Sequence, residues 1–153
     1  MIERHQLFLH EPHNEIFGDC HRTVFACLLD LEPWQVPHFV QDLYVGKHNN
    51  VDVAVDEWLA ERGLFQTHVH FAANENESPE NFFRYMDMWN PDLLWIMGGV
   101  SPRGTNHSVI CQGGGFRWDP HPAGGFLVKP YQEDDFHLYQ ATILAPTSMR
   151  ASS

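Results

Sequence analysis

The spacing of hydrophobic residues changes at about residue 65, and this change constrains the fold more than any other feature of the chain. Before it, apolar residues recur three to four positions apart, as on one face of a helix in the segment 20–31. After it, they alternate with polar residues, as in a half-buried strand over 65–71. This order predicts an α+β domain in which N-terminal helices pack on a C-terminal antiparallel β-sheet.

The same patterns, together with capping and chain-breaking residues, predict the individual elements. Asp19 and Asn50 stand where N-caps are expected, Gly63 is placed to close a helix, and Gly98-Gly99 should end a buried strand. Helices are expected over 20–31, 33–36, from Pro37 through Leu43, and over 51–62 and 80–89. Strands are expected over 65–71, 93–97, 107–111, 116–119 and about 136–144, with a turn at Gly113-Gly114-Gly115.

Length and charge limit the number of domains and the class of partner. With 153 residues, 43% of them hydrophobic, the chain has enough apolar surface for one core, so a single domain over 1–153 is expected. A formal charge of −11 argues against nucleic acid or an anionic membrane as the partner. The sequence has no run of about 18 apolar residues, and its first residues lack the pattern of a signal peptide. The expected location is cytoplasmic.

The three cysteines are an odd number without a CxxC pair, so neither a disulfide framework nor a thiolate zinc site is expected. Cys27 lies on the apolar stripe of the first helix and Cys111 lies within a strand, so both are expected in the core. Cys20 differs because it stands at the head of the first helix, in Gly18-Asp19-Cys20. The positive end of the helix dipole and the free N–H groups there favour a thiolate, which is the attacking form.

Two further groups have a position that suits this thiol. His107 begins one strand and Asp119 ends the next, so a hairpin that turns at the three glycines brings both to the same open end. The carboxylate would then hold one imidazole nitrogen while the other faces the sulfur. Sequence spacing thus permits a triad of Cys20, His107 and Asp119.

Short motifs around these residues resemble the papain-like cysteine peptidases. The motifs are the stretch from Gly18-Asp19-Cys20 to Leu29, Val36-Pro37-His38-Phe39, Ser101-Pro102-Arg103-Gly104 with Asn106-His107, and Asp119-Pro120-His121-Pro122. Within that superfamily, the chain is most similar to compact bacterial and phage members related to the bacteriocin-processing C39 peptidases. The resemblance covers roughly residues 14–122 and implies a papain-like fold and a bacterial or phage origin.

Carried over to this chain, the resemblance implies Cys20 as nucleophile, His107 as general base and then acid, and Asp119 as the residue that orients the imidazole. Many relatives place an oxyanion-binding glutamine six positions before the cysteine, where this chain has Asn14. Asn14, Asp19 and His121 are the expected oxyanion or substrate-binding residues, although His121 between two prolines equally suits a role in stiffening its loop.

The leading functional expectation is a cysteine peptidase or amidase that cleaves an amide, isopeptide or thioester bond of a peptide or protein substrate, without metal or cofactor. One alternative is a metal-dependent hydrolase or metal-binding module built from histidines and carboxylates, since His68 and His70 share one strand face. His5, His10 and His13 also crowd the N-terminus. Another alternative is a papain-like domain that binds a protein without catalysis. The sequence determines neither the substrate nor the oligomeric state.

Overall fold

The structure is a computed structural model that describes residues 1–149. At its centre lies an antiparallel sheet with the strand order β1-β6-β2-β3-β4, and β5 pairs with β6. The strands are β1 Leu64–Ala73, β2 Leu94–Val100, β3 Asn106–Gln112, β4 Gly115–Trp118, β5 Tyr131–Glu133 and β6 Phe136–Pro146. The α-helices are α1 Cys20–Leu28, α2 Phe39–Tyr44, α3 Val51–Ala60 and α4 Glu80–Trp89. Short 3-10 turns, η1 Pro12–Asn14, η2 Pro33–Gln35 and η3 Thr147–Met149, complete the described elements.

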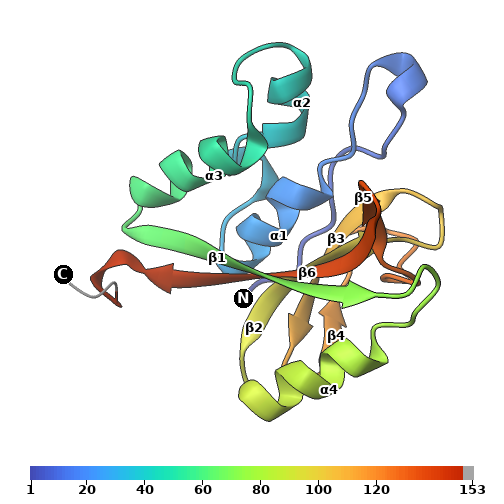
Figure 1. The fold of residues 1–153 in the computed structure, drawn as a ribbon. Helices are drawn as coiled ribbons and strands as arrows, with labels where there is room; N and C mark the ends of the chain where they lie inside the picture. Colours follow the sequence, from blue (N-terminus) through green and yellow to red (C-terminus); the bar gives the residue numbers. More distant parts are fainter. Residues whose placement is uncertain (150–153) are drawn as a thin grey trace.

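Helices cover both faces of the sheet (Figure 1). On one face, α1 to α3 pack against strand residues such as Ile96 and Ile110 around the buried Phe25 and Cys27. On the opposite face, α4 inserts Phe82 and Met86 among strand residues that include Trp95 and Cys111. The strands β1, β2, β3, β4 and β6 each supply apolar side chains to both cores, because successive residues point to opposite faces.

The α+β class is confirmed, and most helix positions agree with the sequence patterns. The Asn50 side chain accepts a hydrogen bond from the Val53 N–H at 3.1 Å and caps α3, and Gly63 follows the helix with a φ of +69°. The helix α1 ends at Leu28 rather than at 31. The packing of α4 on the face opposite α1 to α3 was not predicted, because an amphipathic pattern does not identify the face that the helix will cover.

The prediction that Gly98-Gly99 ends a strand is wrong. The strand β2 runs through both glycines to Val100. A Cβ atom on Gly99 would lie 3.1 Å from the Tyr139 ring and 3.2 Å from Leu127, so the missing side chain makes room for a close approach. The short strand β5 was not expected either.

The N-terminal segment 1–19 crosses the open end of the sheet before α1 begins. The Gln6 N–H donates to the Pro120 carbonyl at 2.9 Å, and the Trp118 indole N–H donates to the Arg4 carbonyl at 2.9 Å. These bonds place the start of the chain beside the segment that follows β4. No helix within residues 1–149 is both long and apolar enough to cross a membrane.

Candidate active site

The start of α1 is fixed by a buried ion pair. The Asp19 carboxylate accepts hydrogen bonds from the Phe8 backbone N–H at 2.8 Å and from Arg22 Nε at 2.9 Å, and its side chain has no exposed surface. Its backbone carbonyl accepts from the Thr23 hydroxyl at 2.7 Å. Cys20 is therefore held as the first residue of the helix, half-buried, where the backbone N–H groups lack intrahelical partners.

The expected contact between His107 and Asp119 is present. His107 Nε2 donates to Asp119 Oδ1 at 2.7 Å, and the two side chains are 4% and 3% exposed. The partners come from the start of β3 and from the residue after β4. The register of these strands shifts between Ile110 and Cys111, so the hairpin contains an irregularity between its turn and its open end.

Two backbone groups hold the Asp119 carboxylate in addition to His107. The His121 N–H donates to Oδ1 and the Phe126 N–H donates to Oδ2, each at 2.8 Å. Burial by itself raises the pKa of Asp119, but the His107 ring and these two hydrogen bonds outweigh it and hold the pKa below its ordinary value. Asp119 therefore carries a negative charge at neutral pH.

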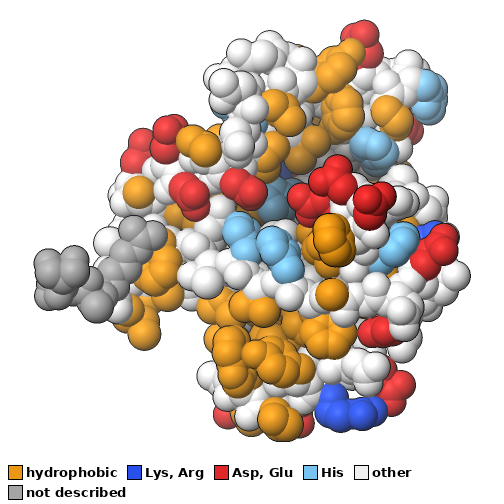
Figure 2. All heavy atoms as spheres, viewed as in Figure 1, with side chains coloured by type: hydrophobic (Ala, Val, Ile, Leu, Met, Phe, Trp, Pro, Cys, Tyr) orange, Lys and Arg blue, Asp and Glu red, His pale blue; other side chains and the backbone are white. Residues whose placement is uncertain are grey.

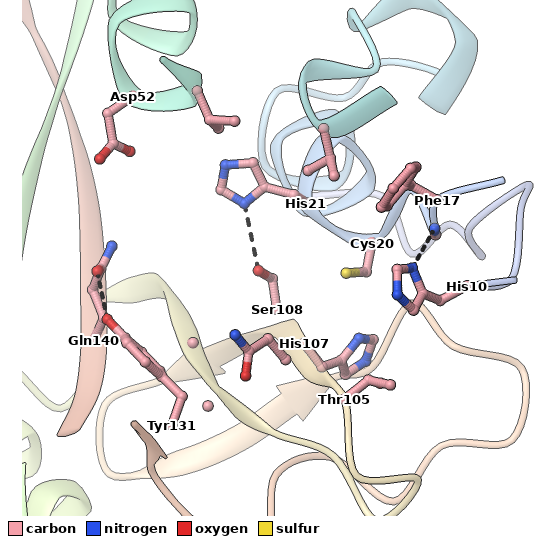
Figure 3. Close-up of a pocket in the computed structure, with 16 residues that line it drawn as sticks. His10, Phe17, Cys20, His21, Asp52, Thr105, His107, Ser108, Tyr131 and Gln140 are labelled. Atoms are coloured by element: carbon pink, nitrogen blue, oxygen red, sulfur yellow. Dashed lines mark hydrogen bonds between the residues drawn. The ribbon is translucent and has the colours of Figure 1, made fainter. Parts of the chain in front are cut away.

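The second nitrogen of the His107 ring is left for the thiol. Burial lowers the pKa of His107, but the hydrogen bond to Asp119 and the interaction with Cys20 outweigh it and raise the pKa to about 9. In Figure 3, the Cys20 sulfur and the His107 ring lie side by side at one end of the cavity. The His107 ring is therefore an imidazolium at neutral pH, and it faces the Cys20 thiol.

The thiol and the imidazole lie where two cavities meet. The first, of about 570 Å³, extends from Cys20 and His107 toward α3, β5 and β6. The second, of about 410 Å³, extends in another direction toward Gln6, Arg103 and His121. A chain lying in both cavities would pass over the reactive pair.

Sequence reasoning missed Gln6, which lines the second cavity together with Cys20 and His107. Its Nε2 donates to the Phe8 carbonyl at 2.7 Å and lies 3.4 Å from the position of a Cβ on Gly18. A primary amide has two N–H groups, so one donor remains for a ligand beside the thiol. The first six residues show no periodic pattern that indicates this role. Gln6 lies at the site because its backbone N–H donates to the Pro120 carbonyl, which fixes the N-terminal segment beside the segment that follows β4.

The three residues expected to bind substrate have different positions. Asn14 is exposed in η1, where its Nδ2 donates to Glu11 at 3.4 Å, and it lines neither of the two cavities, so the structure does not bring it to the thiol. Asp19 is fully buried in its ion pair and cannot contact a ligand directly. His121 lines the second cavity, and its ring centroid lies 6.1 Å from that of His107.

His21, the residue after the thiol, forms part of the wall of the first cavity. Its Nδ1 lies 3.4 Å from Ser108 Oγ, and its ring contacts Phe25 edge-on at 5.2 Å (Figure 3). Burial lowers the pKa of His21 to about 4, an effect that the Asp52 charge partly opposes. The ring is therefore neutral at pH 7.

Of the remaining candidates of the sequence, the two other cysteines stand apart from this site, whereas His10 lines both cavities. Cys27 and Cys111 are fully buried, one in each core. The rings of His68 and His70 stack at 6.4 Å, and His68 bonds to Thr142 at 2.9 Å. Within residues 1–149, no group of three or more histidine, cysteine or acidic side chains is arranged to hold a metal ion.

Comparisons of the chain with protein-family models, curated proteins and solved structures find no match. The function is therefore argued from the geometry of the site.

Proposed function

We propose that the protein is a cysteine-dependent hydrolase of papain-like architecture, with Cys20 as nucleophile, His107 as general base and acid, and Asp119 as the residue that orients the imidazole. One observation carries the proposal. The buried Asp119 carboxylate holds Nε2 of His107 at 2.7 Å, while the ring also interacts with Cys20 at the junction of two cavities. The arrangement of groups corresponds to that of nucleophilic acyl transfer.

In the proposed reaction, the Cys20 thiolate attacks a carbonyl carbon, so a C–S bond forms and the carbonyl electron pair moves to the oxygen. The Cys20 backbone N–H, which begins α1, is placed to stabilise that oxyanion, and the free N–H of the Gln6 amide is a second donor. The His107 imidazolium then gives its proton to the leaving nitrogen as the C–N bond breaks. Asp119 stays ionised and stabilises the imidazolium.

The acyl-enzyme is resolved by water. His107 takes a proton from the water as it attacks the thioester carbonyl, and the collapse of this second tetrahedral intermediate releases the carboxylic acid and the Cys20 thiolate. The polar donors of the site suit an amide, isopeptide or thioester carbonyl equally, and a polypeptide substrate suits the two connected cavities.

The test is cleavage of a synthetic peptide mixture, with the cut bonds identified by mass spectrometry for the wild type and for Cys20→Ala. We expect the wild type to cleave peptides, with or without EDTA, and we expect Cys20→Ala to cleave none. The Cys20 side chain lies outside both cores, so the variant should unfold at nearly the same temperature. Cleavage that survives in Cys20→Ala, or that disappears on chelation and returns with zinc, would overturn the proposal.

A further inference from the structure

The far wall of the first cavity consists of three polar side chains opposite the thiol. Asp52 comes from α3, Tyr131 from β5 and Gln140 from β6, and Figure 3 shows them across the cavity from Cys20 and His107. The volume of about 570 Å³ falls within the range of pockets that enclose a small ligand or a long side chain. The wall is therefore a candidate specificity site.

The far wall of this cavity carries a negative charge. Asp52 is the single acidic residue in the lining, and no lysine or arginine of the described chain lines it. His21 is neutral because its pKa is about 4, and the His107 imidazolium lies across the cavity, beside Cys20. Burial, together with the charges of Glu133 and Asp52, raises the pKa of Tyr131 to about 12, as expected of an anionic environment.

Hydrogen bonding leaves mainly acceptors on the far wall. The Tyr131 hydroxyl donates to Gln140 Oε1 at 3.0 Å. The Gln140 amide nitrogen is occupied by His68 Nδ1 at 2.9 Å and by Thr142 Oγ1 at 3.4 Å. Gln140 Oε1 also bonds to His70 Nε2 at 3.1 Å. The acceptors that remain are the lone pairs of Tyr131 Oη and the Asp52 carboxylate, whose side chain is 66% exposed and lies 3.7 Å from His68 Nε2. Ammonium and guanidinium groups have only donors and so complement this wall.

Acidic side chains also surround the approach to the cavity. Figure 2 shows them over α3 and over the turn between β5 and β6, with a hollow between. The acidic residues on these elements are Asp52, Asp56, Glu57, Glu133, Asp134 and Asp135. With a formal charge of −11, the surface attracts cations and repels acidic peptides.

We propose that this cavity binds a lysine or arginine side chain of the substrate, with Asp52 as its anionic partner and with Tyr131 Oη as a further acceptor. The inference rests on the proposed function for the claim that the bound group belongs to a polypeptide cut at Cys20. An acidic side chain would meet a carboxylate and acceptor oxygens, and an apolar side chain would leave those oxygens desolvated and unpaired. The substrate class is therefore a polypeptide with a basic residue at a fixed distance from the cleaved bond.

The first experiment measures sequence preference with the peptide mixture. We expect lysine and arginine to be enriched at one position relative to the cut bonds of the wild type. Asp52→Asn should lower that enrichment about tenfold or more. Asp56→Asn is the matched control: it removes the same charge from the same helix, but Asp56 bonds to Gln66 at 3.0 Å and lies outside the cavity. If both variants lost the enrichment equally, the preference would depend on the overall charge of the surface rather than on a binding site. That result would overturn the inference.

The second experiment separates the cavity from the catalysis. The probe Nα-acetyl-lysine N-methylamide is titrated into ¹⁵N-labelled Cys20→Ala protein, and Nα-acetyl-norleucine N-methylamide serves as the uncharged control. We expect saturable shifts of amide signals in α3 and β5 with the lysine probe and none with the norleucine probe. The shifts should persist when Asp56→Asn is added to the protein and disappear when Asp52→Asn is added.

The two proposals fail in different ways. If the wild type cuts nothing while the lysine probe still binds in an Asp52-dependent manner, the hydrolase proposal fails and the basic-group site stands. If cleavage depends on Cys20 but shows no basic preference, and the lysine probe does not bind, the site is overturned and the hydrolase proposal stands.

Discussion

The Nε2 atom of His107 lies 2.7 Å from Oδ1 of Asp119, and both side chains are almost completely buried. This bond determines which imidazole nitrogen is free: Nδ1 remains for the thiol. The His121 and Phe126 N–H groups also bind the Asp119 carboxylate and fix its orientation. The carboxylate in turn orients the His107 ring.

Cys20 should be the first thiol alkylated in a brief pulse of iodoacetamide at pH 6. The His107 imidazolium, with a pKa of about 9, favours a thiolate at a pH where an ordinary thiol is almost wholly protonated. Cys27 and Cys111 have no exposed surface and should label only on unfolding. Peptide mass spectrometry identifies the modified residue, and His107→Gln should slow the labelling of Cys20 about tenfold or more at this pH. Faster labelling of Cys27 or Cys111 in the folded protein would contradict the assignment of the nucleophile.

Asp119→Asn should reduce hydrolysis less than Cys20→Ala does. The amide keeps the shape and one of the two acceptor oxygens, but it removes the charge that stabilises the imidazolium. The pKa of His107 should therefore fall and the labelling of Cys20 at pH 6 should slow. Titration of the His107 ring by NMR measures the shift directly. An unchanged pKa of His107 in the variant would show that Asp119 does not act on the ring.

Asp119→Ala separates the structural part of this role from the electrostatic part. The variant leaves the buried N–H groups of His121 and Phe126 without their acceptor, and each unpaired group costs about 1–3 kcal/mol. We therefore expect a loss of at least about 2 kcal/mol in the free energy of unfolding, measured by urea denaturation, and a smaller loss for Asp119→Asn. Equal stability of the two variants would mean that the loop after β4 does not depend on the carboxylate.

The proximity of Cys20, His107 and Asp119 was predictable because each stands at the start or end of an element whose pattern is visible in the sequence. Local patterns position such residues along the chain, and the hairpin of β3 and β4 brings two of them together. The positions of Asp52 and Gln6 in the cavities were not predictable, because no local sequence pattern marks either residue. Asp52 stands in the first turn of α3, where an acidic residue is ordinary, and only the tertiary packing of α3 beside β5 and β6 places it in the cavity.

The errors in the fold have comparable causes. A strand of three residues, such as β5, is too short for alternation to be recognised. Gly98-Gly99 suggested a strand end because glycine is usually found in turns, whereas here Tyr139 and Leu127 pack against the bare backbone of Gly99. Asn14 was assigned by its distance in sequence from Cys20, but the segment before α1 forms the exposed η1 turn and returns to the helix only at its end.

The free energy of unfolding should fall as the pH decreases from about 6.5 to about 4, in part because of His21. Its folded-state pKa of about 4 lies below its ordinary value of 6.5, so in this range the unfolded chain binds a proton that the folded protein does not. The full effect of this one group is about 3 kcal/mol. His107 acts in another range: its stabilisation is complete below pH 6.5 and is lost as the pH rises through about 9.

His21→Phe tests this assignment, since it keeps the aromatic contacts with Phe25 and Phe39. Urea denaturation at pH steps from 7.5 to 4 should show a weaker pH dependence for the variant, by about one proton. The burial that lowers the pKa of His38 affects the same pH range, so the difference between wild type and variant is the decisive quantity. Curves that stay parallel would contradict the assignment to His21.

Gln6→Ala should lower kcat by about 100-fold, while Asn14→Ala should leave it unchanged. Both residues are amides in the segment before α1, but only Gln6 lines a cavity with Cys20, and its free N–H lies near Gly18, beside the thiol. Because an oxyanion donor acts mainly in the transition state, KM for a cleaved peptide should change little in Gln6→Ala. Gln6→Glu, which keeps the size but replaces the donor with a charged acceptor, should be at least as slow. Labelling of Cys20 by iodoacetamide, which forms no oxyanion, should be nearly normal in all three variants and so serves as the control for an intact nucleophile. A loss of kcat in Asn14→Ala with full activity in Gln6→Ala would mean that the segment rearranges around the substrate and that Asn14 is the donor.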